Sequence, residues 1–206
     1  MQVQLDLYNS GKHPGNDADT IQTIKMVTEQ NERLSKMVKT LLDMSELQTV
    51  GRDETIIVNA LVDEVLADLE PLAQEKNIKL IGKCKDVNMV GSDILIYRLV
   101  YNLVENAIKY NHSGGQVSVE AYQREKQVYL SVNDTGNGIP EELKERVFEP
   151  FFRVDKSRSR ELGGVGLGLA LVNEIVRVHD GSIAIRPNPS GGTIIEVEFA
   201  VNRTTA

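Results

Sequence analysis

The sequence is poor in the residues that build covalent cross-links and metal clusters. Its 206 residues include one cysteine, Cys84, and three histidines. A lone cysteine cannot form an internal disulfide, and no Cys or His stands near Cys84 at metal-ligand spacing. A reducing, cytosolic environment therefore fits the composition best.

Long apolar runs and an excess of basic residues are missing as well. No stretch approaches the ~18 consecutive apolar residues of a membrane-spanning helix, and residues 1–6 lack the basic start and apolar run of a secretory signal. The net charge of −7 argues against general nucleic-acid binding. With 41% apolar and 26% charged residues, the composition is that of a globular protein. We therefore expect neither membrane contact nor a nucleic-acid partner.

The sequence divides into a helical part, residues 1–50, and a part in which strands and helices alternate, residues 51–206. Apolar positions recur three and four residues apart over residues 20–48, which predicts a long helix with one apolar stripe. Such a helix is not stable alone in water, so we expect it to pack in a helical bundle. A surface helix lying on its own domain is the alternative.

The second part predicts an α+β fold, a two-layer α/β sandwich with helices on one face of a mixed sheet. Asn59, and Ser92 or Asp93, are expected to cap helices, and Gly181 to end the last helix in the left-handed conformation. The expected helices cover residues 59–76, 92–110 and 166–180. The expected strands cover residues 55–58, 78–82, 87–90, 116–123, 128–133, 182–186 and 193–201.

A polar stripe runs along the otherwise apolar helix expected at residues 92–110. Asn102, Asn106 and Lys109 stand three or four residues apart and so share one helix face, which also carries Arg98 and Glu105. Amide oxygens and an ammonium group suit Mg²⁺ and phosphate. A solvated helix face is the alternative.

Two further motifs follow. Asp134 stands at the end of an expected strand and is followed by Gly136 and Gly138, which would let a flat ring approach the backbone; a simple tight turn also fits. Residues 148–152 contain three of the four phenylalanines, which either fill the core or anchor a mobile segment.

That segment, residues 153–162, is the most basic stretch of the chain and leads into glycines over residues 163–168. Glycines that open a helix expose N–H groups at its positive end, which is a ready phosphate site. The dinucleotide-binding pattern fails because Leu169 stands where a third glycine would be needed. We expect a phosphate site of another design behind a flexible cationic lid.

In this order, residues 102–110, 134–138, 148–152 and 164–169 resemble the N, G1, F and G2 boxes of sensor histidine kinases. The resemblance covers about residues 52–202 and implies the Bergerat ATP-binding fold shared with gyrase, MutL and Hsp90. The helix at residues 20–48 resembles the second helix of the dimerisation and histidine-phosphotransfer hairpin, and residues 1–10 the tail of the first.

The resemblance implies ATP and Mg²⁺ as cofactors. Asn106 would coordinate Mg²⁺ with Asn102 close by, Lys109 and Tyr110 would contact the phosphates or ribose, and Asp134 would accept a hydrogen bond from the adenine amino group. Asn102, Asn106 and Lys109 would form the catalytic set. The other implied ATP-binding residues are Gly136, Gly138, Ile139, Phe148, Lys156, Arg158, Arg160, Gly164, Val165, Gly166, Leu167, Gly168, Leu169 and Thr193.

Two departures from related patterns matter. ATP-hydrolysing members of the superfamily place a Glu four residues before the Mg²⁺ Asn, and Asn102 stands there instead, which favours transfer to a protein side chain. The phosphoacceptor His of the first hairpin helix has no counterpart. His13 and His112 stand in expected loops, and His179 at a helix end, where a positive charge is favourable. We expect that the chain begins after the acceptor, with a degenerate kinase as the second interpretation.

The resemblance therefore implies the cytoplasmic catalytic region of a two-component sensor histidine kinase, whose parent is anchored in the bacterial inner membrane. It would dimerise through the hairpin and transfer the ATP γ-phosphoryl group to a histidine, from which a response-regulator aspartate would take it. Two alternatives are a serine-directed kinase of the anti-sigma type and a non-enzymatic, nucleotide-dependent dimerisation module.

Overall fold

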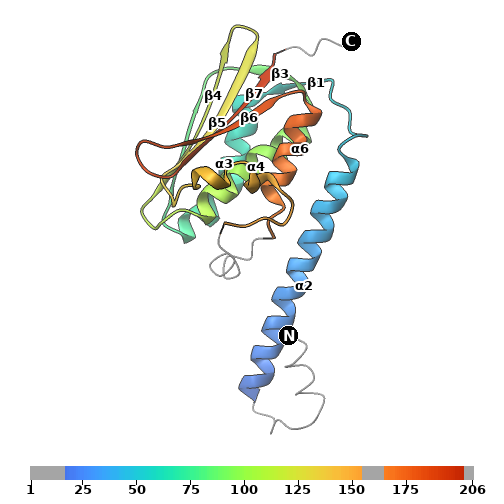
Figure 1. Ribbon diagram of the computed structural model, residues 1–206, viewed down its shortest axis with the longest axis vertical. Helices are drawn as coiled ribbons and strands as arrows, with labels where there is room; N and C mark the ends of the chain where they lie inside the picture. Colours follow the sequence, from blue (N-terminus) through green and yellow to red (C-terminus); the bar gives the residue numbers. More distant parts are fainter. Residues whose placement is uncertain (1–16, 155–164, 202–206) are drawn as a thin grey trace.

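The computed structural model describes residues 17–154 and 165–201, which form a sheet covered on one face by helices, with one long helix leading in (Figure 1). The helices are α2 (Asp17–Glu46), α3 (Val58–Glu75), α4 (Asp93–Lys109) and α6 (Gly168–Val178), with two short 3-10 turns, η1 (Glu141–Leu143) and η2 (Arg146–Phe148). The strands are β1 (Glu54–Ile57), β2 (Lys79–Cys84), β3 (Asn88–Gly91), β4 (Gln116–Arg124), β5 (Gln127–Asp134), β6 (Ser182–Pro187) and β7 (Thr193–Ala200).

The main sheet has the strand order β2-β4-β5-β7-β6. Strands β2 and β4 are parallel and the other neighbours antiparallel, so the sheet is mixed, while β1 and β3 form a separate antiparallel pair. The predicted two-layer α+β fold, with helices on one face of a mixed sheet, is confirmed.

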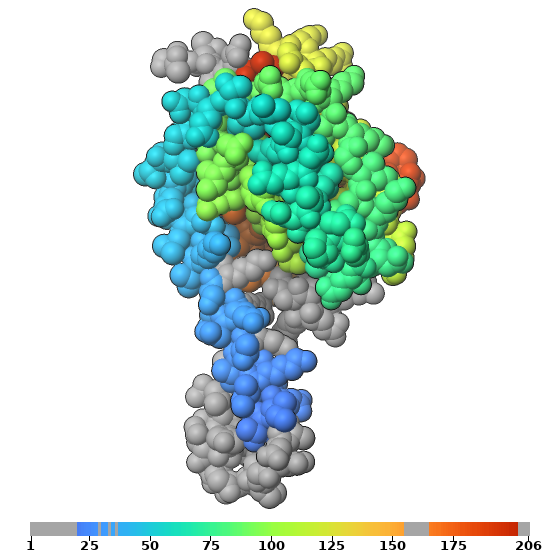
Figure 2. Space-filling view, turned by 180° about the vertical axis from the view of Figure 1, so that it is seen from behind, coloured from blue at the N-terminus to red at the C-terminus, as the bar shows by residue number. Residues whose placement is uncertain are grey.

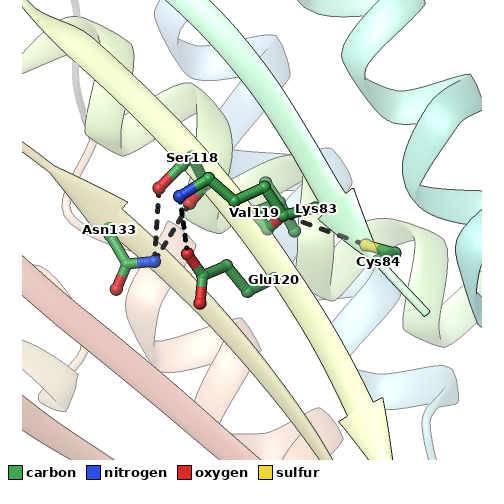
Figure 3. A network of polar contacts seen from close by, with 6 residues as sticks. All are labelled: Lys83, Cys84, Ser118, Val119, Glu120 and Asn133. Atoms are coloured by element: carbon green, nitrogen blue, oxygen red, sulfur yellow. Dashed lines mark hydrogen bonds and ion pairs between the residues drawn. The ribbon is translucent and has the colours of Figure 1, made fainter.

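The two faces of the sheet differ because side chains alternate along each strand. Apolar residues such as Val119 and Leu130 are buried beneath α3, α4 and α6. The opposite face is polar: Lys83 pairs with Glu120 at 3.1 Å, and Asn133 Nδ2 donates to Ser118 Oγ at 3.3 Å (Figure 3). The core therefore lies between the sheet and the helices, with α4 at its centre.

Two of the predicted helix starts are made differently from the expectation. The Asn59 prediction is wrong: Asn59 lies inside α3, and its amide donates to Asp86 Oδ1 at 3.3 Å. Ser92 does precede α4, but its side chain makes no capping bond. The Ser92 N–H donates to His179 Nε2 at 3.1 Å instead, and the Asp93 N–H donates to Glu54 Oε2 at 3.1 Å. At the start of α4, side chains that are distant in sequence, His179 and Glu54, thus accept hydrogen bonds from the backbone N–H groups, and no local side chain caps the helix.

The end of α6 also differs. Asp180, with φ of +54°, takes the left-handed conformation that was expected of Gly181. Gly181 is needed for space, because a Cβ there would lie 2.7 Å from the carbonyl oxygen of Glu198. His179 is buried, and its Nε2 accepts a hydrogen bond, so it acts as a neutral acceptor rather than as a charge at the helix end.

Helix α2 forms where it was predicted and extends away from the sheet and helices (Figure 1). Its C-terminal end is fixed to them, because Leu47 is buried in the core and Asp43 Oδ1 lies 2.9 Å from Arg98 Nη1 of α4. Further back, Ile24 and Leu34 are 60% and 56% exposed. Within the described part of the chain, no helix combines the length and apolarity needed to cross a bilayer. A domain division at residues 50 and 51 stays a prediction.

Candidate functional site

A cavity of about 440 Å³ opens where α4, the adjoining ends of β5 and β7, and the segment before α6 meet. Val132 and Ile195, register partners on β5 and β7, contribute to its apolar lining, and α4 supplies polar side chains. Its size lies within the range of about 300–1,000 Å³ that is usual for small-molecule sites.

Helix α4 directs its polar stripe into this cavity. Asn102, Asn106 and Lys109 all line it, together with Glu105. Asn102 Nδ2 donates to the carbonyl of Arg98 at 2.7 Å, which fixes the side-chain amide. Lys109 Nζ lies 2.7 Å from Glu105 Oε1, so the ammonium is held at the cavity wall by a carboxylate one helical turn earlier.

Asp134, at the end of β5, is the carboxylate that the sheet contributes to the cavity lining. Its Oδ1 accepts hydrogen bonds from the N–H groups of Gly136 at 2.8 Å and Thr193 at 3.2 Å. Burial raises the pKa of Asp134, and these two bonds partly offset the shift. The two bonds fix the orientation of the carboxylate beside the cavity.

Glycines make room for this arrangement. Gly192 has φ of +86°, and a Cβ there would collide with the carbonyl and carboxylate of Asp134 and lie 2.6 Å from the Gly136 nitrogen. At Gly136, a Cβ would lie 2.6 Å from the carbonyl oxygen of Tyr110. The backbone around Asp134 is therefore packed as closely as glycine allows.

The phenylalanine segment forms another wall, but through a different residue from the one expected. Phe152 and Val147 line the cavity, whereas Phe148, at the end of η2, is half-buried and lies outside the lining. Phe151, with φ of +65°, turns the chain so that Phe152 faces the site, and Arg146 stacks on the Phe152 ring at 4.4 Å.

The glycine segment closes the site at the start of α6. Gly166, with φ of +79°, leaves no space for a Cβ, which would lie 2.7 Å from the Phe152 carbonyl oxygen. A Cβ at Gly168 would lie 3.0 Å from Asn102 Oδ1 and 3.5 Å from Asn106 Nδ2. The N-terminal end of α6 thus meets the amide groups of α4, and both line the same cavity.

Most of the predicted site residues that the structure describes are brought together here. Those lining the cavity are Asn102, Asn106, Lys109, Tyr110, Asp134, Gly138, Ile139, Val165, Gly166, Leu167, Gly168, Leu169 and Thr193. Gly136 and Phe148 are not lining residues, although the Gly136 N–H donates to the Asp134 carboxylate. Lys156, Arg158, Arg160 and Gly164 lie outside the described residues.

Several lining residues were not predicted. Val132 and Ile195 are strand residues that look like ordinary core, Asn137 lies within the predicted glycine turn, and Pro140 stands two residues after it. The most distant in sequence is Thr40, on α2. Nothing in the local pattern around Thr40 points to this cavity.

The lining fits the adenine nucleotide and Mg²⁺ that the sequence resemblance implies. Asp134 is an acceptor for an amino group, and the α6 end with its close-packed glycines suits phosphates. In residues 17–154 and 165–201, no group of three or more His, Cys, Asp and Glu side chains could hold a metal ion by itself. Mg²⁺ commonly combines one or two protein oxygens with substrate phosphates, and the Asn106 amide supplies such an oxygen.

The chain is similar to signalling kinases in sequence. Residues 91–203 match the family described as histidine kinase-, DNA gyrase B-, and HSP90-like ATPase. The chain is 36% identical to the sensor-like histidine kinase SenX3 of Mycolicibacterium smegmatis over 86% of this chain and 47% of that protein. It is 34% identical to the sensor histidine kinase WalK of Bacillus subtilis over 82% of this chain and 29% of that protein. The chain thus spans about half the length of these relatives, or less.

Solved structures give a consistent result. The nucleotide-free catalytic domain of the histidine kinase ThkA superposes with a TM-score of 0.66 at 27% identity, covering 74% of this chain and 97% of that one. ThkA in complex with the response regulator protein TrrA superposes with a TM-score of 0.77 at 25% identity, covering 97% of this chain and 57% of that one. The second match includes α2.

Proposed function

The chain belongs to the family of histidine kinase-, DNA gyrase B- and HSP90-like ATPases, and on that premise we propose that it is the ATP-binding catalytic region of a two-component sensor histidine kinase. The observation that carries the proposal is the shared cavity, which joins the amides of Asn102 and Asn106 on α4 to Asp134 and to the glycines before α6. These groups come from three separate sequence segments.

The proposed nucleotide lies with its adenine at Asp134 and its phosphates toward α6. The carboxylate of Asp134 would accept a hydrogen bond from the adenine amino group. The first backbone N–H groups of α6 present a partial positive charge, and Lys109 adds a full one, so both would attract phosphates. Glu105, which pairs with Lys109, keeps that side chain at the wall until a phosphate competes for it.

Asn106, with Asn102 beside it, would hold Mg²⁺ against the nucleotide. When bound, the ion neutralises charge on the phosphates and orients the γ-phosphoryl group. The protein's own contribution is positioning, because neither amide can remove a proton from water. The proposed outcome is transfer to a protein acceptor instead of rapid hydrolysis.

The proposed acceptor is a histidine on a helical hairpin, followed by an aspartate of a response regulator. His179 is unsuited to this role because it is buried and accepts the hydrogen bond of the Ser92 N–H, just before α4. The complex of ThkA with its response regulator TrrA supports the second step by analogy. A homodimer formed through α2 is part of the same proposal, supported by the exposed apolar residues of that helix.

The proposal is tested by incubating the chain with γ-labelled ATP and Mg²⁺, alone and with a separate two-helix hairpin fragment that carries a His-Glu pair. We expect label on the fragment only, and we expect it to be acid-labile, as phosphohistidine is. An Asn106→Ala variant should lose the transfer, whereas Asn88→Ala, at an exposed position on β3 outside the cavity lining, should keep it.

The other outcomes separate the alternatives. Acid-stable label on serine would support the anti-sigma type of kinase. Nucleotide-dependent association without any transfer would support a dimerisation module. Label on His13 of the chain itself would contradict the expectation that the acceptor is supplied by another segment.

A further inference from the structure

We propose that helix α2 forms one wall of the nucleotide cavity, with Thr40 as a further nucleotide-contacting residue and the Asp43–Arg98 ion pair as the contact that positions it. The inference rests on the proposed function, because it takes the occupant to be an adenine nucleotide. Thr40 lies on a helix whose sequence pattern indicates only helix packing, yet it lines the same cavity as Asn102 and Asn106.

The ion pair joins α2 directly to the helix that carries the two asparagines. Asp43 Oδ1 lies 2.9 Å from Arg98 Nη1, and the two side chains are only 17% and 27% exposed. The carbonyl of the same Arg98 accepts the hydrogen bond from Asn102 Nδ2 at 2.7 Å. Arg98 therefore contacts α2 with its side chain and the cavity amide with its backbone.

The register of the two helices explains why Thr40 reaches the cavity. Asp43 of α2 contacts Arg98 of α4, and Glu54, further along the chain in β1, contacts Asp93 at the start of α4. The later residue thus meets the earlier part of α4, which indicates that α2 and α4 run antiparallel. Thr40 stands about one turn before Asp43, and Asn102 about one turn after Arg98. Thr40 and Asn102 therefore lie at about the same height along the two helices, each one turn away from the ion pair in the same direction.

The end of α2 is held firmly enough to serve as a wall. Leu47 is buried in the hydrophobic core, and Arg52 Nη1 donates to the Leu47 carbonyl at 3.1 Å. Seen from behind, the C-terminal half of α2 lies against the main body while its N-terminal half projects away (Figure 2). The ion pair and Thr40 both belong to the attached half.

Thr40 belongs to the phosphate end of the proposed nucleotide. Thr40 lies at about the same height along α2 as Asn102 does along α4. The Oδ1 of Asn102 faces the start of α6 at Gly168. Asp134, the proposed adenine acceptor, lies at the end of β5. A threonine hydroxyl can donate to a phosphate oxygen. We therefore expect Thr40 to affect nucleotides with phosphates and not adenosine.

Coupling between two binding events is reciprocal, so attachment of α2 and binding of phosphates should strengthen each other. Calorimetric titrations with Mg²⁺ and a non-hydrolysable ATP analogue, and with adenosine, would be made on the wild type, Asp43→Asn and Thr40→Val. We expect each variant to weaken analogue binding about two- to fivefold, the size expected for a partly exposed ion pair or one hydrogen bond, and to leave adenosine binding unchanged.

Two further variants sharpen the test. Lys83→Met removes the Lys83–Glu120 pair on the far, polar face of the sheet and should change neither affinity. The charge exchange Asp43→Arg with Arg98→Asp should recover analogue binding relative to Asp43→Asn. Amide exchange in residues 40–46 should be slowed by the analogue in the wild type and not in Asp43→Asn.

Analogue affinity that stays at the wild-type value in both Asp43→Asn and Thr40→Val would overturn this inference alone. An equal loss for adenosine and the analogue would also overturn it, because that result indicates general loosening of the cavity. Failure of the wild type to bind any adenine nucleotide would overturn the proposed function and this inference with it.

Discussion

Asp134 has to meet two demands at once, since it is fixed by two backbone N–H groups and must still present an acceptor to a ligand. Partial burial raises the pKa of its carboxyl group above the ordinary value. A carboxyl whose folded-state pKa is raised stabilises the fold at low pH, and this contribution is lost as the pH rises through that pKa. At neutral pH the ionised group therefore costs folding free energy that its proposed function requires.

Replacement of Asp134 by asparagine should separate stability from binding. The amide oxygen can still accept the two N–H groups, so we expect Asp134→Asn to unfold at neutral pH with at least the wild-type free energy. Adenine nucleotides should bind at least about tenfold more weakly, because an amide NH₂ would meet the adenine amino group. Wild-type affinity should fall as the pH is lowered through the raised pKa. Calorimetry and denaturant unfolding measure these effects.

Asp63→Asn, an exposed change on α3, is the matched control and should alter neither property. Unchanged ATP affinity in Asp134→Asn would contradict the assigned role of this carboxylate.

At the scale of elements, the sequence predicts what depends on local periodicity and fails where distant groups decide. The polar stripe of α4 and the glycine turn after β5 could be predicted because each lies within one segment. Phe152 lines the cavity, whereas the predicted Phe148 does not, because the chain turns at Phe151, whose φ is positive. No local sequence pattern indicates this turn. Thr40 could not be found from the sequence at all, since its position depends on how α2 contacts α4.

His179 is a second example, because it links the end of α6 to the start of α4. Its Nδ1 lies 2.8 Å from the Ile175 carbonyl, and its Nε2 accepts the Ser92 N–H. We expect His179→Ala to lower the free energy of unfolding by about 1–3 kcal/mol, because a buried N–H loses its acceptor. Denaturant unfolding measures this loss, and His112→Ala, at an exposed loop position, should be close to neutral. Equal stability of the two variants would show that the His179 contact adds nothing.

At the scale of the whole molecule, α2 presents an apolar stripe that the described residues leave uncovered. Leu34, Val38 and Leu41 stand four and three residues apart and are 56%, 56% and 46% exposed. Exposed stripes of this kind mark association sites. The proposed homodimer would bury them, and its population would depend on protein concentration.

Sedimentation over a range of concentrations should therefore show a reversible dimer. Leu34→Lys should shift the equilibrium toward the monomer, because it places a charge in the stripe, whereas Lys39→Ala, on an exposed polar position, should not. A strict monomer at every concentration, with α2 intact by circular dichroism, would contradict the association.

The central claim is that one cavity binds an adenine nucleotide through Asp134 and the glycines before α6. Amide hydrogen exchange of the full chain with Mg²⁺ and ATP tests it most directly, with GTP as the control because guanine carries a carbonyl oxygen where adenine carries its amino group. The account predicts slower exchange at residues 134–138 and 166–169 with ATP and not with GTP. Protection by both nucleotides alike, or ATP protection confined to other segments, would contradict it.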